Sequence, residues 1–339
     1  MRKLLNTLYI TNEQAYLALD GENVVCKVGN EIKINLPFDN VENIVCFGYL
    51  GCSPALMGKC VSKQIPINFL SPNGKFLAKV CGETKGNVFL RVAQIDKFRE
   101  CSLILAKNTI ATKINNSIKL IKRTLHDNSD LKEDEDITQK VIMLKNAIDK
   151  IFLQENIESV LGIEGNAAKD YFSIFGKMFT NKSVDLKFSY RSKRPPLDEI
   201  NATLSFVYTL LTLEYASALE TVGLDSSIGF YHTLRSGRNS LACDLVEETR
   251  CIVERFVISL VNLKIITKKD FDIQISSACW LNSEGRKKVL TKWQEKKREI
   301  VMHPFLKEKI PYGMIPYVQS NLLAKYIRGD LDEYPCYGI

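Results

Sequence analysis

The chain has 339 residues, 45% of them hydrophobic, and a formal net charge of +7 at pH 7. This length and apolar content exclude an unstructured tail and predict a core divided over about two domains. Polar residues interrupt the apolar run at 200–222, which argues against a bilayer-spanning helix. We expect the start of the chain to be a first strand, not a signal peptide, because no small-residue cleavage site follows it.

The N-terminal part, from residue 3 to about 80, reads as short strands separated by turns. Apolar runs alternate with turn pairs in AYLALD-GEN-VVCKV-GNE-IKINLPF, and ENIVCFGYLG and IPINFL-SPNG-KFLAKV continue the pattern. One helix is expected at 53–64, where Ser53 suits the N-cap and Pro54 the first helical position. Residues 1–88 are therefore predicted to form a β-rich domain.

The remaining chain, residues 89–339, is predicted to be mainly α-helical. The apolar period changes after Val88, and an acidic polar stretch and a Pro-Pro pair interrupt the helical patterns. The predicted fold class is a multidomain α+β protein, with helices at about 92–125, 137–153, 157–180, 198–222, 239–262, 283–300 and 315–330.

Ten cysteines are scattered along the chain without a CxxC pair. This distribution indicates neither a zinc site nor a disulfide framework, so we expect reduced, mostly buried thiols and a cytoplasmic protein. Phosphate-binding glycine loops, the GxSxG elbow and HExxH are also missing from the sequence, which argues against nucleotide-dependent, serine-hydrolase and zincin chemistry.

The segment from Gly229 to Arg250 contains one of the three histidines, His232, followed by a predicted helix that begins near Asn239 or Ser240. On a helical wheel Asp244, Glu247 and Glu248 lie together outside the apolar arc. Asp244 and Glu247, three residues apart, would be neighbours whose repulsion a divalent cation removes. A solvated acidic face beside an ordinary loop histidine is the alternative interpretation.

Two further features lie close to this chemistry. Arg235 and Arg238 follow the histidine, with Gly237 between them, and suit a phosphodiester near a metal, although ordinary loop arginines are equally compatible. Glu164 is flanked by Ile163 and two glycines and is expected to be nearly buried, where a carboxylate needs a cation or hydrogen-bond donors. A carboxylate stabilised by a helix N-terminus is the alternative for Glu164.

One histidine and three carboxylates form a hard ligand set that favours Mn²⁺ or Mg²⁺ over zinc. Such a metal activates an attacking oxygen for in-line displacement at phosphorus, whether the oxygen belongs to water or to a sugar 3′-hydroxyl. The chemistry alone does not separate a nuclease from an integrase.

Residues 279–309 hold nine basic and four acidic side chains, concentrated in GRKKVLTKWQEKKRE at 285–299. This helix is expected to contact nucleic-acid phosphates through Arg286, Lys287 and Lys288, or else to be a solvated lysine-rich helix. Trp293 is expected to pack in the core, and His126 and His303 to be structural.

Three motifs stand in order along the chain: GIEGNAAKDYF around Glu164, RPPLDEINATLSFVYTLL at 194–211 and GFYHTLRSGRNSLACDLVEETR at 229–250. Together they resemble the Cas1 family of CRISPR-associated proteins, the integrases of spacer acquisition. The two ends of the chain resemble the type I-C branch of that family.

The resemblance implies an N-terminal β domain for dimerisation and partner contacts, a helical catalytic domain, and a homodimer. Two such dimers would flank a Cas2 dimer in a heterohexamer that acts on a prespacer duplex and a CRISPR repeat. The implied catalytic residues are Glu164, His232, Asp244 and Glu247, of which Glu164, His232 and Glu247 would bind the metal and Asp244 would assist.

The activity implied by the resemblance is two transesterifications, in which prespacer 3′-hydroxyls attack the ends of a repeat while Arg235 and Arg238 hold the phosphate. Two alternatives use the same residues. One is a general metal-dependent nuclease acting on branched or single-stranded DNA, and the other is a non-catalytic DNA-binding scaffold.

Overall fold

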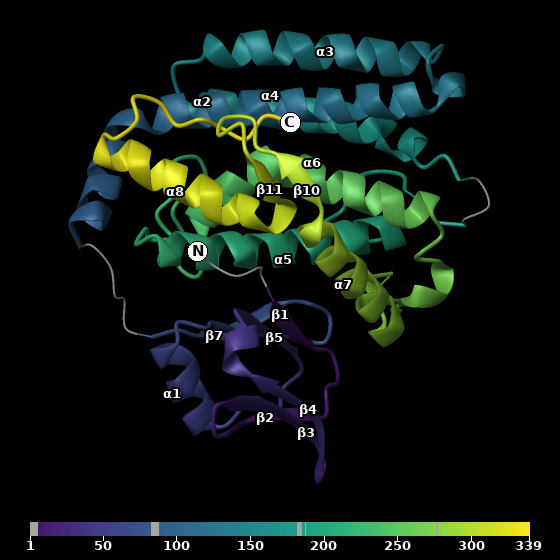
Figure 1. The fold of residues 1–339 in the computed structure, drawn as a ribbon. Helices are drawn as coiled ribbons and strands as arrows, with labels where there is room; N and C mark the ends of the chain where they lie inside the picture. The colour runs from purple at the N-terminus through teal and green to yellow at the C-terminus, as the bar shows by residue number, and fades with distance from the viewer. Residues whose placement is uncertain (1–5, 83–87, 182–184, 187, 276) are drawn as a thin grey trace.

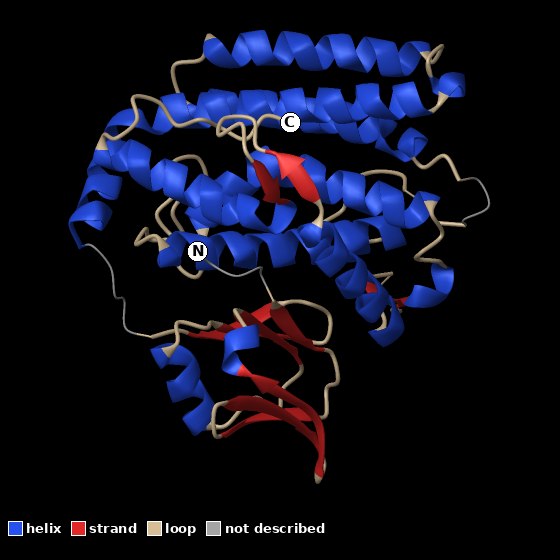
Figure 2. Cartoon of the chain, in the orientation of Figure 1, coloured by secondary structure: helices blue, strands red, loops and turns tan. Residues whose placement is uncertain are grey.

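The protein is described by a computed structural model that covers residues 6–82, 88–181, 185–186, 188–275 and 277–339. A β-rich part at the N-terminus lies below a larger helical part (Figure 1), and the chain is coloured by secondary structure in Figure 2. The predicted fold class, β-rich followed by mainly α-helical, is confirmed.

Two small sheets and one helix form the β-rich part. Its strands are β1 (Thr7–Ile10), β2 (Ala15–Asp20), β3 (Asn23–Val28), β4 (Glu31–Pro37), β5 (Asn43–Phe47), β6 (Ile67–Leu70) and β7 (Phe76–Val80), and its helix is α1 (Pro54–Ser62). One sheet has the order β1-β5-β6-β7, and β2, β3 and β4 form an antiparallel meander. The predicted first strand is β1, although residues 1–5 lie outside the described part.

The turn signals of the sequence are confirmed in this part. Gly21 and Gly29 have φ angles of +56° and +59° in the two turns of the meander, a conformation that glycine adopts without strain. At α1 the Ser53 hydroxyl accepts a hydrogen bond from the Leu56 amide at 3.2 Å, and Pro54 is the first helical residue.

The helical part is layered, with α3 outermost, then α2 and α4, then α6 and α8, and with α5 and α7 on the side of the β-rich part (Figure 1). Its helices are α2 (Val88–Asp127), α3 (Glu135–Phe152), α4 (Ile157–Phe175), α5 (Glu199–Thr221), α6 (Ser240–Asn262), α7 (Ser283–Arg298) and α8 (Ile315–Arg328). These match the seven predicted helices, with boundaries shifted by a few residues.

Two short antiparallel ribbons that the sequence did not predict join the later helices: β8 (Phe271–Ile273) with β9 (Cys279–Leu281), and β10 (Ile300–Met302) with β11 (Lys309–Pro311). Their strands are only three residues long, too short for a period of two to stand out in the sequence.

The central helices α5 and α6 are buried on most of their surface. Of the helices in the described part, α5 alone is long and apolar enough to cross a membrane by length and composition, but 72% of its apolar window is buried inside the protein. The rings of Phe47 in β5 and Phe206 in α5 lie 5.7 Å apart and connect the two parts of the chain. Trp293 and His303 are both buried, as predicted for packing and structural residues, whereas His126 is exposed at the end of α2.

The C-terminal segment crosses α2 and α6 and fixes them together. The buried Asn116 side chain of α2 donates hydrogen bonds to the Glu248 carbonyl at 2.9 Å and to the Tyr337 carbonyl at 2.8 Å. The Glu248 carboxylate accepts the Tyr337 amide at 2.6 Å and the Tyr334 hydroxyl. The Glu248 carboxylate thus points toward the C-terminal segment.

Candidate functional site

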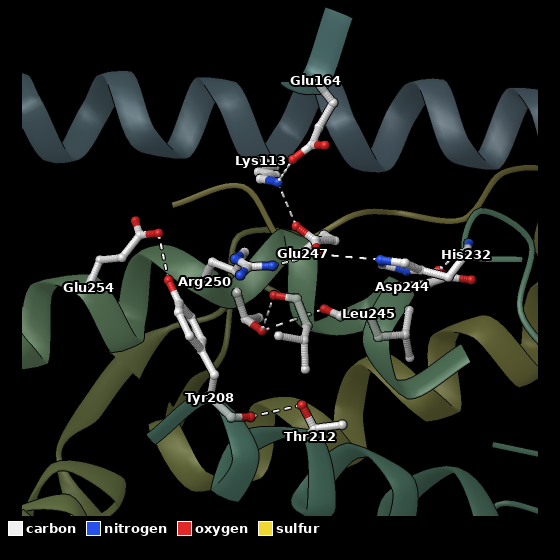
Figure 3. Close-up of polar contacts among 12 residues, drawn as sticks. Lys113, Glu164, Tyr208, Thr212, His232, Asp244, Leu245, Glu247, Arg250 and Glu254 are labelled. Carbon is white, nitrogen blue, oxygen red and sulfur yellow. Dashed lines mark hydrogen bonds and ion pairs between the residues drawn. The ribbon is translucent and has the colours of Figure 1, made fainter. Parts of the chain in front are cut away.

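Asp244, Glu247, Arg250 and Glu254 form a polar stripe along one face of α6 (Figure 3). The sequence correctly grouped Asp244 with Glu247. The inclusion of Glu248 in the group is wrong, because its carboxylate is held by Tyr334 and Tyr337, and the expectation of a face outside the core is also wrong. Asp244 is 0% and Glu247 5% exposed, because α2 packs over this side of α6. Buried charges require partners, and each member of the stripe has a hydrogen bond or an ion pair, although the Oε2 atom of Glu247 has an ion pair alone.

Asp244 organises the loop that carries His232. Its Oδ2 accepts the Phe230 amide at 2.7 Å and the Tyr231 amide at 3.1 Å, while its Oδ1 accepts the His232 amide at 2.9 Å and contacts the imidazole Nδ1 at 2.6 Å. The imidazole is therefore held by Nδ1, and its Nε2 lies 3.9 Å from Glu247 Oε1. Such a contact on one ring nitrogen fixes the orientation and tautomer of the other.

Glu247 is the centre of the site. Its Oε1 accepts a hydrogen bond from Arg250 at 2.6 Å, and its Oε2 forms an ion pair with Lys113 of α2 at 2.7 Å. The Lys113 ammonium also forms an ion pair with Glu164 of α4, so one cation joins two carboxylates from separate helices (Figure 3). The Glu164 side chain is 21% exposed, less buried than the sequence suggested.

The environment shifts the acidities of these groups in opposite directions. Burial raises the pKa of Glu247, but Arg250, Lys113 and His232 together bring it well below its usual range. Burial raises the pKa of Asp244, and its hydrogen bonds from His232 offset only part of that shift. For Lys113, burial lowers the pKa, but the charges of Glu247 and Glu164 raise it by more. The net pKa is above its usual value, so the group stays an ammonium.

Behind this cluster, Arg250 is held in a fixed position. Its guanidinium lies 4.4 Å from the centre of the Tyr208 ring. The Tyr208 hydroxyl donates to Glu254 at 2.8 Å, and the Tyr171 hydroxyl donates to the same carboxylate at 2.9 Å. The guanidinium therefore presents its donors to Glu247 from a packed support.

A cavity of about 40 Å³ opens beside Glu164 and Glu254. Side chains from α2, α3, α4 and α6 line it, together with Lys193 from the loop before α5. Lys113, Arg250 and Lys193 were not singled out from the sequence. Arg250 offered a signal, since it stands three residues after Glu247 on the same helix face, whereas Lys113 lies 51 residues before Glu164 in a lysine-rich helix without a local signal.

Two carboxylates and an imidazole converge here from α4, α6 and the 223–239 loop, and a cation already lies between the carboxylates. Their donor chemistry fits a hard divalent ion such as Mn²⁺ or Mg²⁺. Within the described ranges, no three His, Cys, Asp or Glu side chains are arranged to hold a metal ion as they stand. The Lys113 ammonium occupies the space between Glu164 and Glu247.

The arginines predicted to contact phosphate lie on a turn beyond His232. Arg235 is exposed and Arg238 half-buried, with Gly237 at φ +74° between them, where glycine is free of strain. The turn follows the histidine directly in the chain.

The basic segment of α7 is only partly available. Lys287 and Lys288 are exposed, and Lys288 pairs with Asp270 at 2.6 Å. The structure argues against the predicted nucleic-acid contact of Arg286. This residue is only 5% exposed, and its guanidinium donates a hydrogen bond to the Leu281 carbonyl at 2.9 Å. Lys297 is buried as well and pairs with Glu214 at 2.9 Å, since this face of α7 packs on α5 and β1.

Comparison with known proteins gives consistent matches over nearly the whole chain. The family profile described as "CRISPR associated protein Cas1" matches residues 8–295. A "CRISPR-associated endonuclease Cas1 1" of Chlorobaculum tepidum is 40% identical over 99% of this chain and 98% of its own length. A "CRISPR-associated endonuclease Cas1 2" of Rhodospirillum rubrum is 42% identical, with the same coverage of both chains.

Solved structures show the same fold at lower sequence identity. A casposase bound to an integration product superposes with a TM-score of 0.85 at 22% identity and covers 98% of this chain and 94% of its own. A Cas1 protein from Thermotoga maritima gives a TM-score of 0.81 at 22% identity, covering 96% of this chain and 97% of its own.

Proposed function

The chain belongs to the Cas1 family of CRISPR-associated endonucleases and integrases, and from that membership we propose that it is a metal-dependent DNA integrase. It would insert short prespacer DNA into a CRISPR array by attack of the prespacer 3′-hydroxyls on phosphodiesters at the two ends of a repeat. The predicted metal ligands are Glu164, His232 and Glu247, with Asp244 as the residue that orients His232.

One observation supports the proposal: Glu247 of α6 lies 3.9 Å from His232 Nε2 on one oxygen and shares the Lys113 ammonium with Glu164 of α4 on the other, so side chains from three separate segments meet at one buried carboxylate. Ionisable groups gathered in a partly buried position, with the pKa of Glu247 strongly perturbed by its charged neighbours, are typical of functional sites. The fold match to a casposase bound to an integration product is consistent with this chemistry.

In the proposed reaction, a bound Mn²⁺ or Mg²⁺ supplies Lewis-acid activation of a hydroxyl and neutralises charge at phosphorus. Asp244 holds the imidazole of His232 through Nδ1 and so keeps Nε2 turned toward Glu247. Arg250 keeps Glu247 ionised and fixed in orientation. Arg235 and Arg238 are proposed to contact the phosphate that is attacked.

The proposed partners follow from the family and from the names of related structures. A chain of a Cas6-RT-Cas1–Cas2 complex shares this fold, with a TM-score of 0.83 and 20% identity. The match covers all of the present chain and 36% of the chain in that complex. We propose DNA and Cas2 as partners, a homodimer formed through the β-rich domain, and a heterohexamer with Cas2. The type I-C branch and a cytoplasmic location in a prokaryotic cell belong to the same proposal.

A strand-joining assay tests the activity. Purified protein, with and without Cas2, is incubated with a labelled prespacer duplex and a supercoiled plasmid bearing a repeat, in Mn²⁺, Mg²⁺ or EDTA. We expect label in the plasmid only with metal and Cas2, and none for Glu164→Ala or His232→Ala. Glu284→Ala, at an exposed position in the first turn of α7, serves as the matched control.

The products separate the alternatives. Metal-dependent cutting without joining would replace the integrase with a general nuclease acting through the same residues. Joining that survives in both variants would place the active site elsewhere. Binding without cutting or joining would leave a DNA-binding scaffold.

A further inference from the structure

Lys113 is the partly buried cation that α2 contributes to the site. Its ammonium contacts Glu164 on α4 and lies 2.7 Å from Glu247 Oε2 on α6, and its side chain is 14% exposed. Both oxygens of Glu247 are therefore engaged by cations, Oε2 by Lys113 and Oε1 by Arg250 at 2.6 Å. In this arrangement each negative charge of the site is already balanced.

A divalent ion bound to Glu164 and Glu247 would need the same carboxylates that now hold the ammonium. The third proposed ligand, His232, approaches the other oxygen of Glu247, since its Nε2 lies 3.9 Å from Oε1. An ammonium and a divalent cation at one position repel by several kcal/mol even at the effective dielectric of a protein surface. The two cations are alternatives for one position.

We propose that Lys113 is a tethered counter-cation that competes with the divalent ion for Glu164 and Glu247 and is displaced when the ion binds. This inference rests on the proposed metal-dependent function. It adds a residue that sets the metal affinity of the site and keeps the carboxylates from repelling one another before metal arrives.

The surroundings of Lys113 make this displacement a movement of its side chain alone. Ile110 and Ile114 on either side of it are buried in the core, so the backbone of α2 is fixed at this point. The cavity of about 40 Å³ is lined by Lys113 itself, Ser117 and Tyr171, and it exceeds the roughly 10–15 Å³ that one water molecule needs. A rotated ammonium can be accommodated and solvated there, beside the Glu164 and Glu254 side chains that also line the cavity.

Metal binding without DNA provides a test that does not depend on activity. Mn²⁺ affinity is measured by calorimetry for the parent protein, for Lys113→Met and for Lys122→Met, an exposed lysine on the same helix. Lys113→Met is expected to bind Mn²⁺ about tenfold or more tightly than the parent, because a competing charge is removed, while Lys122→Met matches the parent. Equal or weaker binding by Lys113→Met would overturn the inference.

Glu164→Gln and His232→Ala separate this inference from the proposed function. If the parent binds Mn²⁺ and both of these variants lose it, the metal site stands and the Lys113→Met result decides the inference alone. If the parent binds no Mn²⁺, or binds it independently of Glu164 and His232, the proposed metal site and the role of Lys113 fail together.

A second measurement uses the unsubstituted protein, in case Lys113→Met does not fold. Lysines are acylated briefly at constant pH with and without saturating Mg²⁺, and the modified fraction at Lys113 is measured by peptide mass spectrometry. Displacement predicts a several-fold rise at Lys113 with Mg²⁺ and no change at Lys122. Unchanged modification of Lys113 at saturating Mg²⁺ would show that the ammonium keeps its place.

Discussion

The carboxylate of Asp244 accepts the backbone amide of His232 at 2.9 Å and contacts the Nδ1 atom of the same residue at 2.6 Å. One wholly buried side chain on α6 thus fixes both the backbone and the ring of a histidine twelve residues earlier. Since Oδ2 accepts the amides of Phe230 and Tyr231 as well, Asp244 acts as the anchor of the loop, and its effect on the chemistry passes through His232.

Asp244→Asn should therefore lower both the stability and the Mn²⁺ affinity. An amide has one accepting oxygen where the carboxylate has two, so two or more of the donors lose their partner, at a cost of about 1–3 kcal/mol. Urea unfolding and Mn²⁺ calorimetry measure the two effects. Asp272→Asn, at an exposed residue of β8, should change neither. An Asp244→Asn protein with unchanged metal affinity would contradict the orienting role.

Gly229 allows this loop to pack closely against α6. A Cβ atom there would lie 2.5 Å from Asp244 Oδ2 and 2.9 Å from the Ser240 carbonyl carbon, so the loop or α6 would have to move. Gly229→Ala is expected to destabilise the fold by about 1–3 kcal/mol and to reduce strand joining. Chemical denaturation and the joining assay check both.

Gly165→Ala provides a control of opposite sign. A Cβ at this glycine, next to Glu164 on α4, meets nothing within 4 Å. Alanine should stabilise the helix by up to about 1 kcal/mol and leave joining unchanged. If Gly229→Ala were as stable as Gly165→Ala, the close approach of residue 229 to Asp244 would be wrong.

Glu248 should make the stability of the protein depend on pH. Burial raises its pKa to about 7, despite the hydrogen bonds from Tyr334 and the Tyr337 amide that lower it. The folded state therefore binds a proton more tightly than the unfolded chain, and stability falls as pH rises from about 4.5 to 7, by roughly 3 kcal/mol.

Glu248→Gln mimics the protonated acid and isolates this effect. Its free energy of unfolding should vary less between pH 5 and 8 than that of the parent, while other groups titrate equally in both proteins. His303, whose pKa burial lowers, opposes the trend in the same range by weakening the fold toward acid, but it is common to both. Parallel pH profiles for the two proteins would show that Glu248 is ionised throughout.

The sequence predicted most of the fold because the deciding signals are local. Apolar periods, Ser53-Pro54 and the glycine turns each act within a few residues, and the helices they predict are present. The grouping of Asp244 and Glu247 also follows from helical spacing alone. Their burial does not, because it depends on α2, which lies more than a hundred residues earlier, and the position of Lys113 depends on the same packing.

The basic run of α7 shows the same limit. Arg286, Lys287 and Lys288 are adjacent and chemically alike, so the sequence assigned all three to phosphate contacts. Helical geometry turns Arg286 into the core and leaves Lys287 in solvent. Which of two neighbouring cations is free is decided by the side of the helix that β9 and the β-rich part cover.

Arg286→Gln and Lys287→Gln should therefore have separate effects. Loss of Arg286 leaves the Leu281 carbonyl without its donor and should cost about 1–3 kcal/mol of stability, with no change in the salt dependence of DNA binding. Loss of Lys287 should stay within about 0.5 kcal/mol in stability and, if it contacts a phosphate, reduce the slope of log K against log salt by about 0.9. Denaturant titrations and DNA-binding isotherms at several salt concentrations measure both quantities. A buried residue cannot release a counterion, so a reduced slope for Arg286→Gln with unchanged stability would contradict the burial of Arg286 and return it to the DNA-binding surface.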